Sequence, residues 1–122
     1  MIAGPVRKNP NIKMKTFEEY EHEAAKTAIY PGKGSGTGMA LAYTSLGLIG
    51  EAGEATEKIK KFIRDGVLDK RLVALELGDV LWYLTALANE VGYSLQDIAQ
   101  MNYVKLARRL EEGTLRGSGD TR

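Results

Sequence analysis

Residues 72–84 read LVALELGDVLWYL, and this stretch decides the fold. Its apolar residues recur at steps of three and four, the spacing that places them on one face of an α-helix. The pattern continues as far as Gly92, and Asp69 can cap its start. We therefore expect a buried helix here that carries two acidic residues, Glu76 and Asp79, among its apolar ones.

Three other segments carry the same helical pattern. A hydroxyl residue followed three positions later by an acid, the mark of a capped helix start, occurs at Thr16 and at Ser94. Glycines stand where the apolar patterns end, as is common after a helix. The expected helices run from about Phe17 to about Ile29, from about Met39 to Arg64, between Asp69 and Gly92, and between Ser94 and Gly113.

The glycine-rich segment 30–38, YPGKGSGTG, should be a loop, because its glycines cost too much backbone entropy for a helix or strand. A mobile connector or lid is the favoured interpretation. A direct phosphate cradle is the alternative, although the P-loop motif G-x-x-x-x-G-K-[ST] after a strand is absent.

No segment alternates with period two, so we expect an all-α chain without a sheet. Four helices with short connectors predict an antiparallel four-helix bundle-like domain over residues 15–112. Residues 1–14 should be a flexible N-terminal arm, and residues 113–122 a glycine-rich C-terminal tail. Apolar residues extend beyond one stripe of the second and third helices, so we expect a homodimer or homotetramer.

Composition excludes several classes of function. The 122 residues carry a net charge of +1, which offers no broad cationic field for nucleic acid, and we expect no nucleic-acid partner. Cysteine is absent and His22 is the only histidine, so a metal must be held by oxygen. We expect no signal peptide or membrane span, and a cytoplasmic protein.

The acidic residues form two pairs with the same spacing. Glu51 and Glu54 lie three apart in the second helix, as Glu76 and Asp79 do in the third. Antiparallel helices can bring these four carboxylates together, and such a cluster favours Mg²⁺, with Mn²⁺ as a possible substitute. The alternative is ordinary exposed acids paired with neighbouring lysines and arginines. A di-iron bundle would require E-x-x-H pairs, and neither helix contains histidine.

The segments 47–61, GLIGEAGEATEKIKK, and 76–84, ELGDVLWYL, resemble the E-x-x-E and E-x-x-D signature of MazG-like nucleoside triphosphate pyrophosphohydrolases. The resemblance extends from about residue 16 to residue 122. It implies cleavage between the α and β phosphates, which yields a monophosphate and pyrophosphate. Gly50 stands where the fuller motif has a first acid, which leaves the number of metal ions open. The resemblance implies as metal ligands Glu51, Glu54, Glu76 and Asp79.

Glu51 or Glu54 is the candidate general base, and basic and polar residues elsewhere are candidate substrate contacts. The Asn-x-x-Lys-Leu-x-x-Arg pattern of the last helix resembles the region of the family that meets substrate, whereas a solvated stripe is the alternative. The tail that follows could wrap a phosphate or be disordered. Tyr83, which follows Trp82, could stack on a nucleotide base, and packing in the core or an interface is the alternative. The candidate contacts are Lys58, Lys61, Tyr83, Asn102, Lys105, Arg109 and Arg116.

These observations predict a Mg²⁺-dependent hydrolase of (deoxy)nucleoside triphosphates that removes surplus or damaged nucleotides, a role implied by the resemblance alone. Two alternatives remain. One is a non-catalytic helical bundle whose acids hold a structural cation or a basic partner, and the other is a dedicated dUTP or dCTP hydrolase.

Overall fold

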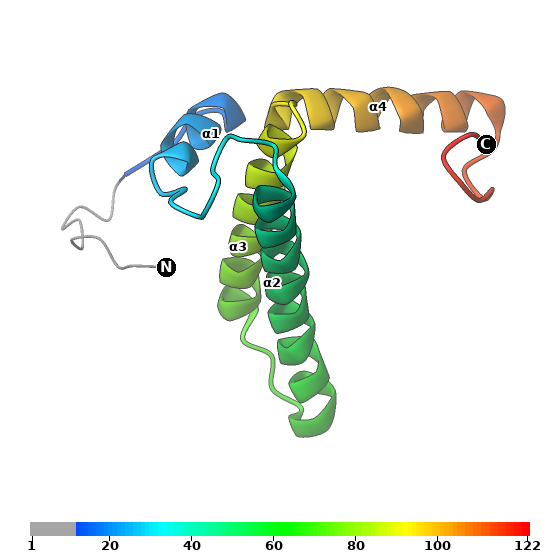
Figure 1. Ribbon diagram of the computed structural model, residues 1–122. Helices are drawn as coiled ribbons and strands as arrows, with labels where there is room; N and C mark the ends of the chain where they lie inside the picture. The colour runs from blue at the N-terminus through cyan, green and yellow to red at the C-terminus, as the bar shows by residue number, and fades with distance from the viewer. Residues whose placement is uncertain (1–11) are drawn as a thin grey trace.

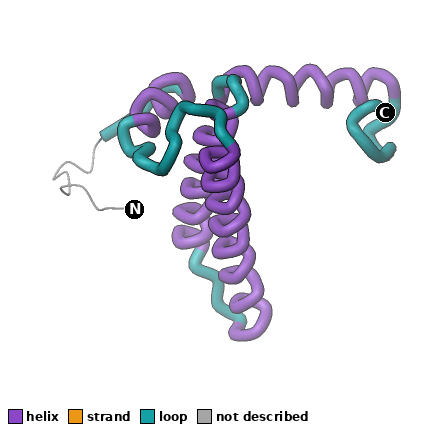
Figure 2. The backbone as a smooth tube through the Cα atoms, in the orientation of Figure 1, coloured by secondary structure: helices purple, strands orange, loops and turns teal. Residues whose placement is uncertain are grey.

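The computed structural model describes residues 12–122, and the predicted N-terminal arm before residue 12 lies outside this range. The described chain contains helices and loops and no strand (Figure 2). The prediction of an all-α chain is therefore confirmed. The helices are α1 (Phe17–Ala25), α2 (Gly38–Asp65), α3 (Lys70–Glu90) and α4 (Leu95–Glu112).

The helices start where side chains satisfy their first amides. The hydroxyl of Thr16 accepts a hydrogen bond from the Glu19 amide at 3.1 Å. Ser94 and Asp97 form a complete capping box, in which each side chain accepts from the other residue's amide. At its C-terminal end, α2 stops at Gly66, which adopts the left-handed conformation (φ 78°) that glycine accommodates without strain.

Helix α1 ends earlier than the sequence pattern predicts. It stops at Ala25, so the expected extension to Ile29 is wrong. The hydroxyl of Thr27 donates to a carbonyl of the last turn at 2.8 Å and accepts from the Trp82 indole N–H at 2.8 Å. Pro31 also follows closely, and a proline disfavours helical geometry in the residue before it.

Helices α2 and α3 run antiparallel and side by side, and they form the long hairpin that holds the candidate site (Figure 1). Helix α1 packs near the end of the hairpin where α3 leads into α4. Helix α4 then leaves the hairpin steeply and contacts α1 and α3 but not α2. One chain therefore pairs only two of its four helices along their length.

The buried core of a single chain is small. It consists of Ala28, Tyr30, Ala40 and Ala86, with Trp82 packed against them. These residues join the segment at the start of the glycine-rich loop to the start of α2 and the last turns of α3. The core therefore fixes one end of the hairpin, whereas the middle relies on the pairing of α2 with α3.

A buried carboxylate ties the glycine-rich loop to α3. Glu90 accepts hydrogen bonds from the Tyr30 hydroxyl at 2.8 Å, the Gly34 amide at 3.0 Å and the Gly36 amide at 3.2 Å. Gly34 and Gly36 have φ values of 77° and 64°, which side-chain-bearing residues rarely adopt. The segment is a loop, as predicted, and Glu90 sets where α2 begins relative to the end of α3.

Helix α3 is long and apolar enough to cross a bilayer, judged by length and composition alone. Core helices of soluble proteins pass the same test. In the described chain α3 pairs with α2 along its length and carries Glu76 and Asp79 within its apolar stretch. Only 17% of its apolar window is buried within the chain, so packing against α2 covers part of its apolar surface.

Candidate active site

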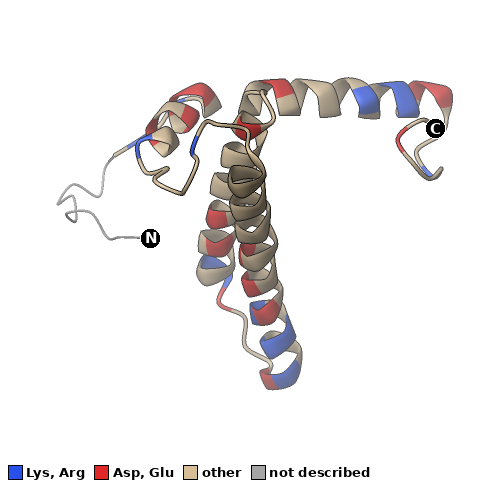
Figure 3. Ribbon diagram, in the orientation of Figure 1, with Lys and Arg blue, Asp and Glu red and all other residues tan. Residues whose placement is uncertain are grey.

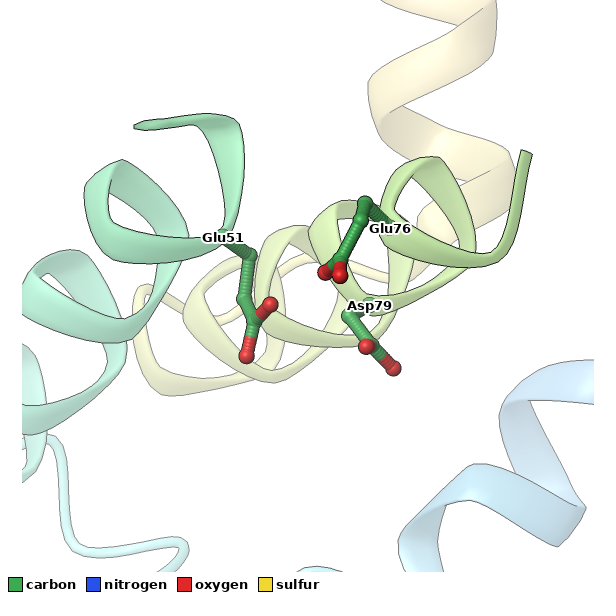
Figure 4. A group of neighbouring side chains, drawn as sticks. All are labelled: Glu51, Glu76 and Asp79. Atoms are coloured by element: carbon green, nitrogen blue, oxygen red, sulfur yellow. The ribbon is translucent and has the colours of Figure 1, made fainter. Parts of the chain in front are cut away.

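Three carboxylates from the two hairpin helices meet at one point (Figure 4). Glu51 comes from α2, and Glu76 and Asp79 come from α3. One oxygen of each lies within 4.8 Å of the others, and all three residues are half-buried. The spacing of three places Glu76 and Asp79 on one face of α3, and the antiparallel pairing places Glu51 opposite them.

The pKa of Glu51 is strongly raised. Burial, followed by the charges of Glu54 and Asp79 and by the proximity of Glu76, raises its pKa to about 7. Its Oε2 atom is buried and has no hydrogen-bond partner among residues 12–122. A buried acceptor without a donor costs free energy, which a bound cation would remove. Because the donors are all carboxylate oxygens, the group fits a hard divalent cation.

Lys58 provides one positive charge beside the three carboxylates. Its Nζ atom lies 3.5 Å from Oε1 of Glu76, across the gap between α2 and α3. The Lys58 side chain is 32% exposed and that of Glu76 is 17% exposed, so the pair is only partly screened by water. The single Lys58 ammonium cannot neutralise three carboxylates, so the group attracts a further cation.

Two predicted site residues of α2 lie outside this group. Glu54 is exposed, and its charge contributes to the raised pKa of Glu51. Lys61 is exposed as well, and its Nζ atom lies 3.9 Å from a carboxylate oxygen of Glu57. The metal-binding role of Glu54 and the substrate-binding role of Lys61 therefore stay predictions.

Tyr83 packs closely against α2 at the edge of the carboxylate group. A Cβ atom at Gly47 would overlap the Tyr83 ring, so a glycine is required for this approach. Trp82 meets the same ring edge-on, with centroids 4.9 Å apart. Burial, followed by the neighbouring Tyr43 and the charge of Glu51, raises the Tyr83 pKa. Tyr83 thus lies near the carboxylates, and its contact with a base stays a prediction.

The predicted substrate contacts of α4 lie away from the carboxylates of the same chain (Figure 3). Asn102 and Arg116 are exposed. Lys105 Nζ and Arg109 Nη2 share one carboxylate oxygen of Asp120, at 3.1 Å and 3.2 Å. The Arg109 side chain is only 6% exposed. The structure therefore does not bring these residues to the carboxylate group within one chain.

Sequence reasoning missed Tyr20 of α1 as a neighbour of the site. Burial and then the charge of Asp79 raise the pKa of Tyr20, which places its hydroxyl within electrostatic reach of the carboxylate group. Tyr20 belongs to no recognisable motif. Its position depends on how α1 packs against α3, which no spacing in the sequence reveals.

Comparison with known proteins gives two matches. The model of the MazG nucleotide pyrophosphohydrolase domain matches residues 41–114, which contain all three grouped carboxylates. The Gene 37 protein of Mycobacterium phage L5 is 43% identical over 109 residues, which cover 84% of this chain and 96% of that protein. No solved structure matches. The domain match and the extent of this identity show that the chain belongs to the MazG nucleotide pyrophosphohydrolase family.

Proposed function

We propose that the protein hydrolyses (deoxy)nucleoside triphosphates between the α and β phosphates and releases a monophosphate and pyrophosphate. A divalent metal is the usual cofactor of the family, and we propose Mg²⁺, for which Mn²⁺ can substitute. The supporting observation is the group formed by Glu51, Glu76 and Asp79, with its buried, unpartnered oxygen, inside the matched domain. The biological role is removal of surplus or damaged nucleotides.

Each carboxylate has a proposed role. Glu51, Glu76 and Asp79 hold the cation, and Glu54, one turn further along α2, completes the ligand set or acts as general base. A cation held there would supply charge that neutralises the triphosphate and favours ionisation of an attacking water. Because Glu54 is exposed beside the group, its carboxylate is accessible to accept the proton of that water.

Lys58 has a proposed role in binding the leaving pyrophosphate. Its ammonium is paired with Glu76 at 3.5 Å. With Glu76 engaged in holding a cation, the Lys58 ammonium would be free to bind a phosphate oxygen. Stabilisation of charge on a leaving group by a fixed cation is among the larger contributions to catalysis.

A homodimer or homotetramer would cover the apolar surface that a single chain exposes. The chain exposes 9392 Å², whereas a compact monomer of 13.4 kDa exposes about 6500 Å². Large apolar side chains more than two-thirds exposed lie on α2 and on α4, for example Leu46, Ile49, Tyr103 and Leu110. A second copy packed on these faces also allows α4 of one chain to approach the carboxylates of another.

A panel of nucleoside triphosphates, including dUTP and dCTP, tests the proposed reaction. Each is incubated with the full chain in Mg²⁺, in Mn²⁺ or in EDTA, and the products are separated by chromatography. We expect a monophosphate and pyrophosphate, and no turnover in EDTA. Orthophosphate with a diphosphate would show that the proposed bond is wrong, and no turnover on the whole panel would refute the function.

The role of Glu54 is tested by one substitution with a matched control. Glu54→Gln should lower kcat by about a hundredfold or more, the usual effect of removing a general base or a charged ligand. Glu57→Gln is the same change one turn further along α2, on a carboxylate that is paired with Lys60 at 2.9 Å. It should leave kcat within about twofold, since surface ion pairs contribute little. Equal activities of the two variants would exclude Glu54 from the site.

A further inference from the structure

Helix α1 is held to the rest of the chain by polar contacts rather than by a buried apolar face. None of its nine residues is buried, and Phe17 is 57% exposed. The residues that follow the helix differ, since Ala28 and Tyr30 belong to the core. The chain is therefore anchored just beyond the C-terminal end of α1, whereas the helix itself contributes little to the core.

Glu21 links α1 to two other helices through one oxygen atom. Its Oε1 atom accepts hydrogen bonds from the Asn89 side-chain amide at 2.9 Å and from the Leu95 backbone amide at 2.8 Å. Asn89 lies in the last turn of α3, and Leu95 is the first residue of α4, where the backbone amide has no acceptor within its own helix. Hydrogen bonds to a carboxylate are stronger than those between neutral groups, so loss of Glu21 should loosen α1.

A pocket of about 90 Å³ lies between α1 and the last turns of α3. Small side chains leave this space unfilled, and atoms that line a void lose the dispersion contacts that close packing provides. Local opening is easiest in a segment with few buried apolar contacts, so α1 can leave α3 without unfolding of the hairpin. The residues that line the pocket include Ala24, Ala25, Ala28, Trp82 and Ala86.

The face of α1 that carries Glu21 also lies toward the carboxylate group. Tyr20, which precedes Glu21, is half-buried, and burial and then the charge of Asp79 raise its pKa. The Asp79 carboxylate points toward the side on which α1 passes (Figure 4). A movement of α1 would therefore change access to the carboxylate group.

We propose that α1 is a movable cover of the carboxylate group, that it pivots near Ala28 and Tyr30, and that Glu21 holds it closed. The open state admits a nucleotide, and the closed state limits the access of water, as mobile elements do in many enzymes. The inference rests on the proposed function for the identity of the admitted molecule. The movement itself requires neither metal nor turnover.

Hydrogen exchange of the backbone amides, followed by NMR in the full-length protein in EDTA, measures the opening. We expect the hydrogen-bonded amides of α1 to exchange together and at least about tenfold faster than those of residues 76–84 in α3. Glu21→Ala removes the acceptor of two hydrogen bonds and should raise the α1 rate a further tenfold, about, or more, without changing the rate of residues 76–84. Glu21→Gln keeps an acceptor oxygen and should change the α1 rate by less than about threefold.

Glu18→Ala is the matched control for Glu21→Ala. Glu18 is an exposed acid of the same helix, so the two variants lose the same charge from α1. Glu18→Ala should change the α1 exchange rate by less than about threefold, because an exposed charge contributes little.

Two ligands test whether α1 covers the carboxylate group. Bound Mn²⁺ broadens the NMR signals of nearby amides, so the amide of Tyr20 should broaden together with those of Glu51, Glu76 and Asp79, whereas Mg²⁺ should broaden none of them. A nucleoside triphosphate with a methylene group between the α and β phosphates cannot be cleaved there. In Mg²⁺ this analogue should slow the exchange of α1 at least about threefold, because it stabilises the closed state.

The inference is overturned if α1 exchanges no faster than residues 76–84, if Glu18→Ala acts as Glu21→Ala does, or if Mn²⁺ broadens the three acidic residues but not Tyr20. Binding of the analogue, measured by calorimetry, without slower exchange of α1 would also overturn it. Absence of Mn²⁺ broadening at the three acidic residues would refute the proposed metal site, and the exchange rates would still decide whether α1 moves. Hydrolysis in a protein whose α1 fails these tests would refute the cover alone.

Discussion

The raised pKa of Glu51 makes the stability of the metal-free protein depend on pH. Burial, and then the nearby carboxylates, raise this pKa from 4.5 to about 7 in the folded chain. Between these two values the folded protein binds a proton that the unfolded chain releases, so the free energy of unfolding falls as pH rises. Above pH 7 Glu51 is charged in the folded protein, and the full cost of burying this charge lowers the free energy of unfolding. Below pH 4.5 Glu51 is protonated in both states, and this cost is absent.

The magnitude follows from the size of the shift. Each pKa unit corresponds to about 1.4 kcal/mol, and partial access of water reduces the sum, so we expect a loss of about 2 kcal/mol between pH 5 and pH 8. Glu51→Gln should remove this dependence and make the metal-free protein more stable than the parent at pH 8. Mg²⁺ should stabilise the parent at pH 8 and have little effect on the variant.

The measurement is urea unfolding in EDTA at pH 5 and pH 8, at one protein concentration, with and without Mg²⁺. Glu57→Gln serves as the control. Lys60 lowers the pKa of Glu57, so its carboxylate is charged throughout this range and its loss should not alter the dependence. A parent protein equally stable at both pH values, or a Glu51→Gln variant that keeps the dependence, would refute the account of the buried carboxylate.

Three further predictions concern packing, charge and assembly. The Cβ of Gly47→Ala would overlap the Tyr83 ring, so this change should lower the free energy of unfolding by about 2 kcal/mol. The Cβ of Gly50→Ala meets no atom within 4 Å, so this change should raise the free energy of unfolding by up to about 1 kcal/mol. Urea titrations of both variants measure the two effects. Similar effects of Gly47→Ala and Gly50→Ala would contradict the close packing of the Tyr83 ring on Gly47. Lys58→Met removes the ammonium beside Glu76 and should tighten Mg²⁺ binding about threefold, as calorimetry would measure. An unchanged Mg²⁺ affinity would argue against the pairing of Lys58 with Glu76. Light scattering should give at least twice the 13.4 kDa chain mass, and a monomer mass would exclude the oligomer.

Much of the fold follows from local features of the sequence. The caps at Thr16 and Ser94 were predicted correctly because a cap involves only neighbouring residues. The grouping of Glu51 with Glu76 and Asp79 was expected because helical spacing fixes which residues share a face. Once two apolar faces pair antiparallel, the acids on those faces lie together.

The remaining features depend on contacts between distant segments. No local pattern indicates that α4 leaves the hairpin, that Arg109 is buried under the C-terminal tail, or that Tyr20 lies near Asp79. Just past the early end of α1, Thr27 is hydrogen-bonded to Trp82, which is far away in sequence. Such contacts override helical propensity and become visible only in three dimensions.

The hydrogen bonds of Glu90 limit how the length of the hairpin can change during evolution. The hairpin is fixed at one end by the turn between Asp65 and Lys70 and at the other by Glu90. An inserted residue turns one part of a helix by about 100° relative to the other, so a single insertion between Glu51 and Asp65 would put the part of α2 positioned by Glu90, which carries Glu51, out of register with the part positioned by the turn. Seven residues added to each helix between the carboxylates and the turn restore the same faces. We therefore expect related chains to differ in hairpin length by whole heptads, and single insertions to be confined to the turn.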